Sequence, residues 1–205
     1  MKTLLINGSP HANGCTFTAL SIVAEELQKN GIETEIVHIG NKDIHGCIAC
    51  GKCAELGRCV FNDMVNEVAQ KFEQADGLVV GSPVYYGGPN GTLTNLLDRL
   101  FFSTPFDKRM KVGASVVSAR RGGTTAAFDR LNKYFTISEM PVVSSRYWNM
   151  VHGHTSEDVM KDEEGVQIMR ILGRNMAFLI RAIAAERERN GLPEKEEIHY
   201  TNFIR

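Results

Sequence analysis

The stretch that decides the fold is KTLLINGSPHANGCTFT, residues 2–18. It begins with the short apolar run Leu4–Ile6, which is typical of a buried strand. The run stops at residues 7–10, Asn-Gly-Ser-Pro, a cluster of turn-forming residues. Apolar residues then return with the three- and four-residue spacing of a helix, at Phe17, Leu20, Ala24 and Leu27. The stretch therefore predicts a strand, a tight turn and a helix.

The turn at residues 7–16 has the composition of an anion-binding site. A strand that ends in such a turn presents backbone N–H groups at the positive end of the next helix, where phosphate binds without a lysine. The hydroxyls of Ser9 and Thr16 would add donors. The stretch has neither the Walker ending nor the dinucleotide Gly-x-Gly-x-x-Gly, so a single phosphomonoester fits better. The alternative is an ordinary strand-to-helix turn.

The remaining chain alternates between expected strands and helices. The strands are expected at residues 4–6, 32–39, 77–81 and 112–117, with a short fifth one beginning at 141–143. This alternation predicts an α/β fold with a doubly wound parallel sheet and helices on both faces.

The length of 205 residues suits one domain, residues 1–205. Two further segments of the domain are expected outside the sheet. One is a cysteine-rich loop at residues 43–61, which is longer than a compact domain usually carries without a function. The other is a C-terminal helix and tail at residues 156–205, where apolar residues recur at helical spacing from Val166 to Ile183.

Three of the expected loops meet at the carboxyl edge of the sheet, where open parallel sheets bind ligands. The first is the phosphate-type turn. The second, Pro83–Tyr86, offers an apolar and aromatic surface for a flat ring. The third offers Ser118 and the flexible backbone of Gly122 and Gly123, with Arg120 and Arg121 beside them. A phosphate at one end and a flat heterocycle at the other describe a mononucleotide, and flavin mononucleotide (FMN) fits best.

Three motifs resemble the NADPH-dependent FMN reductase family of flavodoxin-like proteins: residues 8–16, residues 81–86 and Asp98-Arg99. The resemblance covers nearly the whole chain. It implies a five-stranded sheet in the order 2-1-3-4-5, FMN as cofactor and NAD(P)H as electron donor. The candidate cofactor-binding residues are Ser9, His11, Asn13, Gly14, Cys15, Thr16, Pro83, Val84, Tyr85, Tyr86, Ser118, Arg121, Gly122 and Gly123.

The resemblance also assigns roles within that set. It implies that Ser9, Asn13 and Thr16 hold the phosphate and that Pro83–Tyr86 flank the isoalloxazine. The family commonly has arginine where this chain has His11, and asparagine where it has Cys15. We expect His11 to remain able to donate a hydrogen bond and Cys15 to be a small helix-start residue rather than a nucleophile. Asp98 and Arg99 are expected to form a structural ion pair.

Four of the five cysteines lie within thirteen residues, as Cys47-x2-Cys50-x2-Cys53-x5-Cys59. The motif is similar to the compact motif of the iron-sulfur flavoproteins, a branch of the same superfamily, and it implies a [4Fe–4S] cluster held by those four thiolates. The spacing differs from the bacterial ferredoxin run. Zinc, a disulfide and free thiols are the alternatives.

Composition and charge exclude several classes of partner. The formal net charge is −1, so the chain has no electrostatic footprint for nucleic acid or an anionic membrane surface. Its first apolar run is only three residues long, too short for a signal peptide, and no apolar stretch approaches a membrane span. Cysteines packed into one loop favour a reducing compartment over a disulfide framework, so a cytoplasmic location is expected.

The sequence predicts an FMN-dependent oxidoreductase that passes electrons from NAD(P)H to flavin, quinone or a similar small acceptor. One alternative is an iron-sulfur flavoprotein that carries electrons to a redox partner protein without oxidising nicotinamide. Another is a binding or regulatory module without flavin. Aromatic residues near the ligand edge, at 85–86 and 147–148, predict a homodimer or homotetramer.

Overall fold

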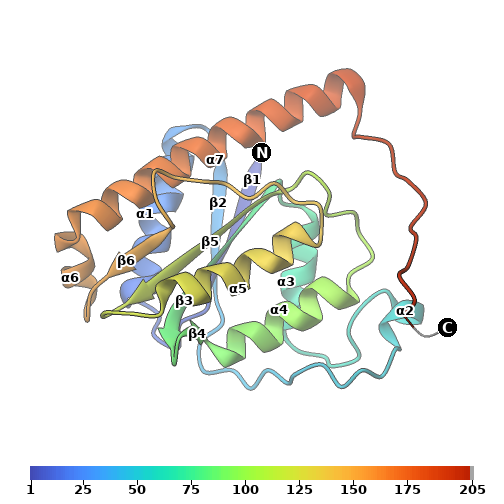
Figure 1. Cartoon of the computed structure of the whole chain (residues 1–205), viewed down its shortest axis with the longest axis horizontal. Helices are drawn as coiled ribbons and strands as arrows, with labels where there is room; N and C mark the ends of the chain where they lie inside the picture. The colour runs from blue at the N-terminus through green and yellow to red at the C-terminus, as the bar shows by residue number, and fades with distance from the viewer. Residues whose placement is uncertain (204–205) are drawn as a thin grey trace.

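A computed structural model describes residues 1–203 of the chain. Its parallel sheet has the order β2-β1-β3-β5-β6, and a short strand, β4, pairs antiparallel with β3 (Figure 1). If β4 is left out of the numbering, this is the expected order 2-1-3-4-5, so the predicted flavodoxin-like fold is confirmed. The strands are β1 Lys2–Asn7, β2 Glu33–His38, β3 Gly77–Tyr85, β4 Gly88–Pro89, β5 Val112–Ala119 and β6 Met150–His152.

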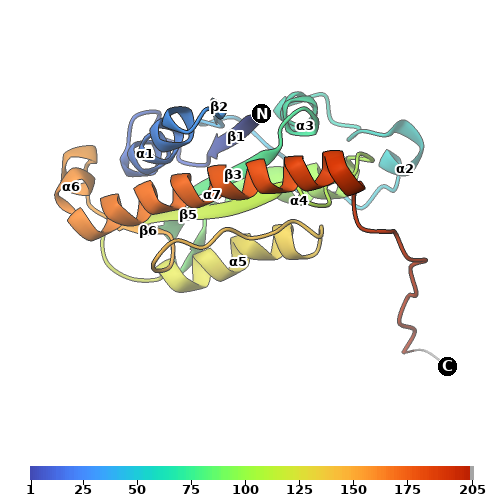
Figure 2. The ribbon, with the colours of Figure 1, turned by 90° about the horizontal axis from the view of Figure 1, so that it is seen from above.

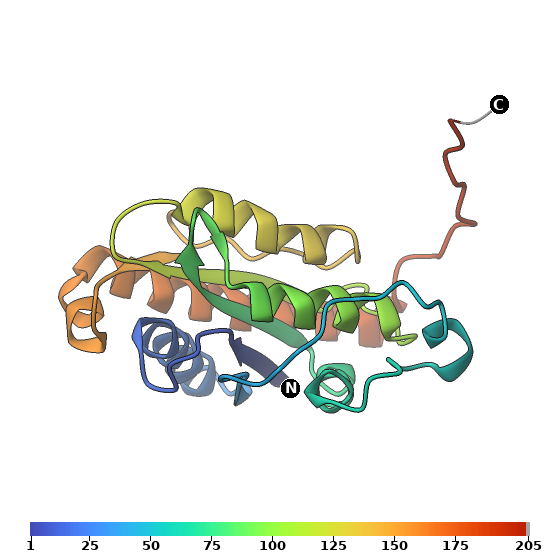
Figure 3. The same cartoon turned by 90° about the horizontal axis from the view of Figure 1, so that it is seen from below.

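Helices cover both faces of the sheet. Helices α1 and α7 contribute to one apolar cluster, and α3, α4 and α5 contribute to the other. Helix α7 crosses in front of the strands when the molecule is seen from above (Figure 2), and α4 does so from below (Figure 3). The helices are α1 Cys15–Lys29, α2 Cys53–Leu56, α3 Met64–Glu73, α4 Gly91–Ser103, α5 Thr124–Thr136, α6 Ser156–Lys161 and α7 Glu163–Asn190.

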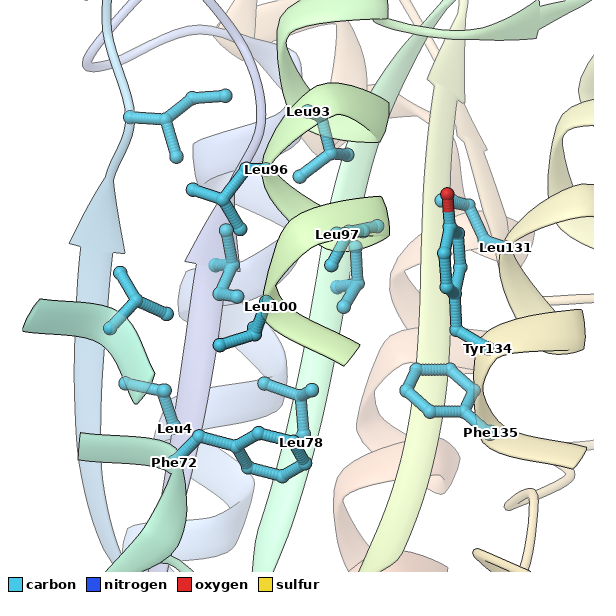
Figure 4. Packing of buried hydrophobic residues seen from close by; sticks show 14 of the residues in the cluster. Leu4, Phe72, Leu78, Leu93, Leu96, Leu97, Leu100, Leu131, Tyr134 and Phe135 are labelled. Carbon is cyan, nitrogen blue, oxygen red and sulfur yellow. The ribbon is translucent and has the colours of Figure 1, made fainter. Parts of the chain in front are cut away.

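Helix α4 shows how the apolar pattern becomes packing. Leu93, Leu96, Leu97 and Leu100 recur at helical spacing and are fully buried. They lie over the strands, where Leu4 of β1 and Leu78 of β3 belong to the same cluster (Figure 4). Burial of each leucine contributes roughly 1.5–3 kcal/mol. This face therefore fixes α4 firmly on the sheet, with its first residue at the carboxyl edge.

The fifth strand is not where the sequence analysis put it. Residues 141–143 make only an isolated bridge, Gly113 with Val142, and the strand beside β5 is β6. The error arose because Val142-Val143 has the composition of a strand, whereas Met150–His152 is too short to give a pattern. Tyr147 and Trp148 consequently precede the fifth strand instead of following it.

The segment between β2 and α3 carries the clustered cysteines. It runs along α4 to the short helix α2 at the far end of the molecule (Figures 1 and 3). The side-chain amide of Asn95 on α4 donates to the carbonyl of Ile44 at 2.9 Å, which holds the segment against that helix. In the part of the chain that the structure describes, no helix is long and apolar enough to cross a membrane.

Candidate functional site

An open cleft at the carboxyl edge of the sheet holds about 210 Å³ and is formed by the loop after β1 and the carboxyl ends of β3 and β5, with a contribution from the turn after β6. The residues that line it are Ser9, His11, Gly14, Cys15, Thr16, Pro83, Val84, Tyr85, Ser118, Ala119, Arg120, Gly153 and His154. The structure thus brings together the three loops that the sequence analysis selected.

The first loop is held in shape by Asn7, the last residue of β1. Its side-chain oxygen accepts a hydrogen bond from the Ser9 backbone N–H at 3.1 Å, and its amide donates to the carbonyl of Ala12 at 3.4 Å. The His38 ring lies 2.9 Å from the Ser9 carbonyl. Asn7 and His38 were not among the predicted site residues. The sequence feature that could have identified Asn7 was an amide side chain at the end of a buried strand.

Helix α1 begins inside the cleft. Its N-cap residue is Gly14, and among the described residues no side chain caps this end. The first N–H groups of α1 therefore keep their hydrogen-bonding capacity for a ligand. The hydroxyls of Thr16 and Ser118 lie 2.8 Å apart, so they join the first loop to the third. Both side chains are buried, at 1% and 4% exposure.

The loops approach one another closely because glycine leaves room. The Gly8 N–H donates to the Gly81 carbonyl at 2.8 Å. A Cβ atom at Gly8 would lie 2.5 Å from the Leu93 side chain, so no larger residue fits without a shift of α4. The side-chain amide of Asn90, the N-cap of α4, donates to the Gly8 carbonyl at 2.7 Å.

Several predicted site residues do not line the cleft. Asn13 and Arg121 are exposed outside it, and Arg120 lies at its wall in place of Arg121. Gly122 is also outside the lining, and Gly123, at φ +89°, packs against Gly87. Gly153 and His154 were missed as lining residues because the position of β6 was predicted wrongly.

Tyr86 also lies outside the lining, fully exposed, at the turn between β3 and β4. Its φ of +50° is in the left-handed region, which non-glycine residues seldom adopt. The hairpin of β3 and β4 imposes this conformation, and an outlier of this kind is characteristic of ligand-binding loops.

Cys15 lies at the start of α1 with its sulfur 3.6 Å from the Gly153 carbonyl. Burial raises the pKa of its thiol. A hydrogen bond from its own backbone N–H lowers the pKa in part, and the carboxylates of Asp158 and Glu157 raise it. A protonated thiol is a poor nucleophile. The pKa direction agrees with the expectation that Cys15 is a helix-start residue.

A second, small pocket, about 20 Å³, lies where the cysteine segment meets the C-terminal end of α4. Cys47, Cys50, Cys53 and Cys59 all line it, together with apolar side chains such as Phe61 and Phe102. Cys59 is buried, Cys53 is half-buried, and Cys47 and Cys50 are exposed. Within residues 1–203 all the cysteines are free, and no three metal-ligating side chains are gathered as a metal centre.

Cys59 is the most firmly held of these cysteines. The Asn66 side chain on α3 accepts a hydrogen bond from the Cys59 N–H and donates to the Cys59 carbonyl, each at 3.1 Å. Arg99 on α4 donates its Nε–H to the Cys59 sulfur at 3.2 Å. The same guanidinium makes a two-pronged pair with Asp63, at 2.6 and 2.9 Å.

The expected ion pair between Asp98 and Arg99 is not formed. Adjacent residues of a helix point in different directions, so the two side chains cannot face each other. Asp98 instead accepts hydrogen bonds from Arg130 and from the hydroxyl of Tyr134 on α5. Burial and the neighbouring carboxylate raise the pKa of Tyr134, which keeps this hydroxyl a donor.

Comparison with known proteins places this geometry in a family. Residues 1–155 match the sequence model described as NADPH-dependent FMN reductase. An iron-sulfur flavoprotein of Methanocaldococcus jannaschii is 34% identical over 194 residues, covering 89% of this chain and 99% of that protein. Another, from Methanosarcina thermophila, is 30% identical and covers 92% of this chain and 100% of its own length.

Solved structures support the fold. RosB, crystallised with 8-demethyl-8-formylriboflavin-5'-phosphate, superimposes with a TM-score of 0.71 at 14% identity, over 100% of this chain and 92% of its own. A flavodoxin from the domain Archaea gives a TM-score of 0.60 at 14% identity, over 88% and 99%. The chain belongs to the NADPH-dependent FMN reductase family, in its iron-sulfur flavoprotein branch, and is an FMN-dependent oxidoreductase.

Proposed function

We propose that the cleft binds FMN with its phosphate at the N-terminus of α1. The observation that carries this proposal is the uncapped start of a fifteen-residue helix, with the hydroxyls of Ser9, Thr16 and Ser118 around it. Backbone N–H groups at such a helix end favour an anion, and neutral hydroxyls add donors without a charge. Arg120 supplies the positive charge at the wall of the cleft.

The isoalloxazine ring is assigned to the second loop. Pro83, Val84 and Tyr85 line the cleft beyond the phosphate position, and an apolar wall of this kind suits a flat ring. The exposed ring of Tyr86 is held beside them by the left-handed turn. Bound FMN would accept a hydride from NAD(P)H and release electrons singly or in pairs. The residues of the chain bind and orient the flavin and exclude water from one of its faces.

The electron donor is NAD(P)H and the acceptor is a small molecule such as a flavin or quinone. Steady-state oxidation of NADPH and NADH by the FMN-loaded protein, with each acceptor in turn, tests this. FMN that binds and is reduced by either nucleotide supports it. FMN that binds but is reduced by neither nucleotide would favour the electron-carrier function. A colourless protein that takes up no added FMN would favour the remaining alternative, a binding or regulatory module without flavin.

We further propose that Cys47, Cys50, Cys53 and Cys59 hold a [4Fe–4S] cluster. The donor set fits, because four free thiols line one largely apolar pocket. Ala49 and Gly51 have φ values of +52° and +71°, so the segment between the cysteines turns tightly. The buried hydroxyl of Ser103 lines the same pocket and has no partner among residues 1–203. Iron and acid-labile sulfide analysis after anaerobic reconstitution tests the cluster, and near-zero iron would refute it.

The electron-carrier function is the second candidate, and the position of the pocket supports it. The N-cap of α4, Asn90, is bonded to Gly8 of the first loop and the last residues of α4 line the cysteine pocket, so about 20 Å of helix separates the two ends. The hydrophobic side chains of Ile48, Leu56 and Phe102 are exposed around the cysteine segment. A docked redox partner would bury them. Four thiols of this kind persist in a reducing compartment such as the cytoplasm.

We propose that the protein assembles as a homodimer or homotetramer. Tyr85 and Tyr86 are exposed at the carboxyl edge of the sheet, Tyr147 and Trp148 are exposed in the segment before β6, and a second copy would cover such side chains. Light scattering at micromolar concentration tests the assembly, and a monomeric mass would refute it.

A further inference from the structure

Arg99 is the largest fully buried side chain in the described chain, with 1% exposure. A buried guanidinium is costly unless all its donors find partners. The two terminal nitrogens of Arg99 donate to the carboxylate of Asp63, and one of them also donates to the His45 carbonyl at 3.2 Å. The remaining nitrogen, Nε, donates to the sulfur of Cys59. The buried charge is therefore anchored on one side by a carboxylate and directed on the other at a cysteine of the pocket.

The choice of acceptor is informative. A neutral thiol is a weak hydrogen-bond acceptor, whereas a thiolate accepts a charge-assisted hydrogen bond strongly. The ring of Phe61, with its centroid 4.8 Å from the guanidinium carbon, stacks on Arg99 and keeps water away from this contact. The Nε–H of Arg99 is thus placed where it gains most when the Cys59 sulfur carries negative charge.

Ser103 lies one helical turn beyond Arg99 on α4, and both residues line the cysteine pocket. Its hydroxyl is buried, with 6% of the residue exposed, and no described residue pairs with it. Buried hydroxyls in native structures are normally paired. A sulfur acceptor held in the pocket would satisfy this one, so the C-terminal turn of α4 offers the pocket a second donor.

The alternative is that Arg99 only fastens α4 to the cysteine segment and α3. Asp63 supports that role, because its carboxylate also accepts the Val65 N–H at the start of α3. The two roles make different predictions. If the pair only fastens these elements together, removing either partner should change the midpoint potential in the same direction. A charged donor beside a redox centre instead gives opposite electrostatic effects when the cation or its counter-ion is removed.

We propose that Arg99, assisted by Ser103, is a positioning residue that fixes the Cys59 sulfur and raises the reduction potential of the group held by the four cysteines. This inference rests on the proposed cluster. Hydrogen bonds to a ligating sulfur and a nearby positive charge both favour the more negative, reduced state. Asp63 offsets part of the charge of Arg99, so the pair sets the potential jointly.

The test is an EPR-monitored redox titration of the anaerobically reconstituted full chain, with iron content measured on each sample. We expect Arg99→Gln to lower the reduction equilibrium constant about tenfold, which is about 59 mV for a one-electron couple. Asp63→Asn, which removes the counter-charge, should move the midpoint in the opposite direction. Ser103→Ala should move it less than Arg99→Gln, with the same sign.

Each outcome decides between the roles. Midpoints that stay unchanged in Arg99→Gln and Ser103→Ala at full iron content would overturn the inference and leave the cluster proposal intact. Shifts of the same sign in Arg99→Gln and Asp63→Asn would assign Arg99 a fastening role. A parent protein that takes up no iron would refute the cluster itself, and the inference with it. Should Arg99→Gln fail to fold, Arg99→Lys and Ser103→Ala decide, since Arg99→Lys keeps the buried charge but loses the Nε–H, and Ser103→Ala removes only the hydroxyl.

Discussion

The cleft at the sheet edge and the cysteine pocket at the far end of α4 differ in how many of their residues are already held in place by hydrogen bonds within the protein. In the cleft, Asn7 already shapes the first loop, and Thr16 and Ser118 are already paired across two loops. In the pocket, Cys59 is held by its neighbours, whereas Cys47 and Cys50 are exposed. Hydrogen bonds within the protein therefore already shape the loops of the cleft, whereas two of the four proposed metal ligands are exposed.

The largest effect is expected in the preformed cleft. Thr16→Glu places a carboxylate at the start of α1, where the phosphate of FMN would lie, and repulsion between like charges in a buried site is strong. We expect FMN to bind at least about a hundredfold more weakly, or about 2.8 kcal/mol. Fluorescence titration measures this.

Gln28→Glu is the matched control for Thr16→Glu, because it adds the same charge at an exposed position near the other end of α1. Its FMN affinity should equal that of the parent, and far-UV circular dichroism should show that both variants are folded. Unchanged FMN affinity in Thr16→Glu would place the phosphate elsewhere.

Hydrogen exchange tests the contrast between the two sites directly. Anaerobic loading with iron and sulfide should slow amide exchange in residues 46–57 by more than about tenfold, because metal binding orders a segment that the fold leaves exposed. FMN should change exchange in residues 4–8 much less, since these amides lie in a buried strand and its turn. Equal protection of residues 46–57 with and without iron would contradict the contrast.

Asn66→Ala removes the side-chain hydrogen bonds that hold the backbone of Cys59. The side chain makes hydrogen bonds to the Cys59 N–H and to the carbonyls of Cys59 and Phe61. We expect the free energy of unfolding, measured in urea, to fall by roughly 1–3 kcal/mol. Retained iron should fall with it, while FMN affinity stays unchanged. Gln70→Ala, at an exposed position of the same helix, should alter none of these quantities. If Asn66→Ala retained as much iron as the parent, the hydrogen bonds from Asn66 to Cys59 would not be needed to hold iron.

The smallest effect is expected at Glu35 of β2, the outermost strand on one side of the sheet. Hydrogen bonds from Lys2 and Lys71 lower the pKa of Glu35. A lowered folded-state pKa gives stability that is present above the unfolded pKa, near 4.5, and is lost as the pH falls through the folded value. Glu35→Gln should therefore cost about 0.5–1 kcal/mol at pH 7.

Urea unfolding at pH 7 and pH 3 measures the Glu35→Gln effect, and the difference from the parent should shrink at the lower pH. FMN and iron content should not change, because Glu35 lies outside both sites. An effect that is equal at the two pH values would exclude the ion pairs as its cause.

Patterns of local composition predicted most of the sheet and the loops of the cleft. The strand run Leu4–Ile6 and the leucines of α4 are buried as their spacing predicts, whereas Phe17 of the expected first helix is only half-buried. Strand β6 escaped prediction because only Met150–His152 pair with β5, and three residues carry no readable period. Its misplacement hid His154 from the predicted lining.

Side-chain partners were beyond the reach of the sequence. Arg99 pairs with Asp63 and Cys59, which are 36 and 40 residues away in the chain. No local pattern reports such contacts, because tertiary packing creates them. The role of Asn7 was hidden for a similar reason, since an asparagine after a strand is also a common turn residue.

The position of the cysteine segment gives the fold a modular character. The segment connects β2, which ends the strand order, to α3, and its pocket shares no lining residue with the cleft among the residues described. An insertion at the margin of a sheet can be lengthened, trimmed or refilled without rebuilding the strands. The proposed cluster site could therefore be exchanged or lost while the sheet and its cleft stay intact, which would make the segment an interchangeable port for electrons.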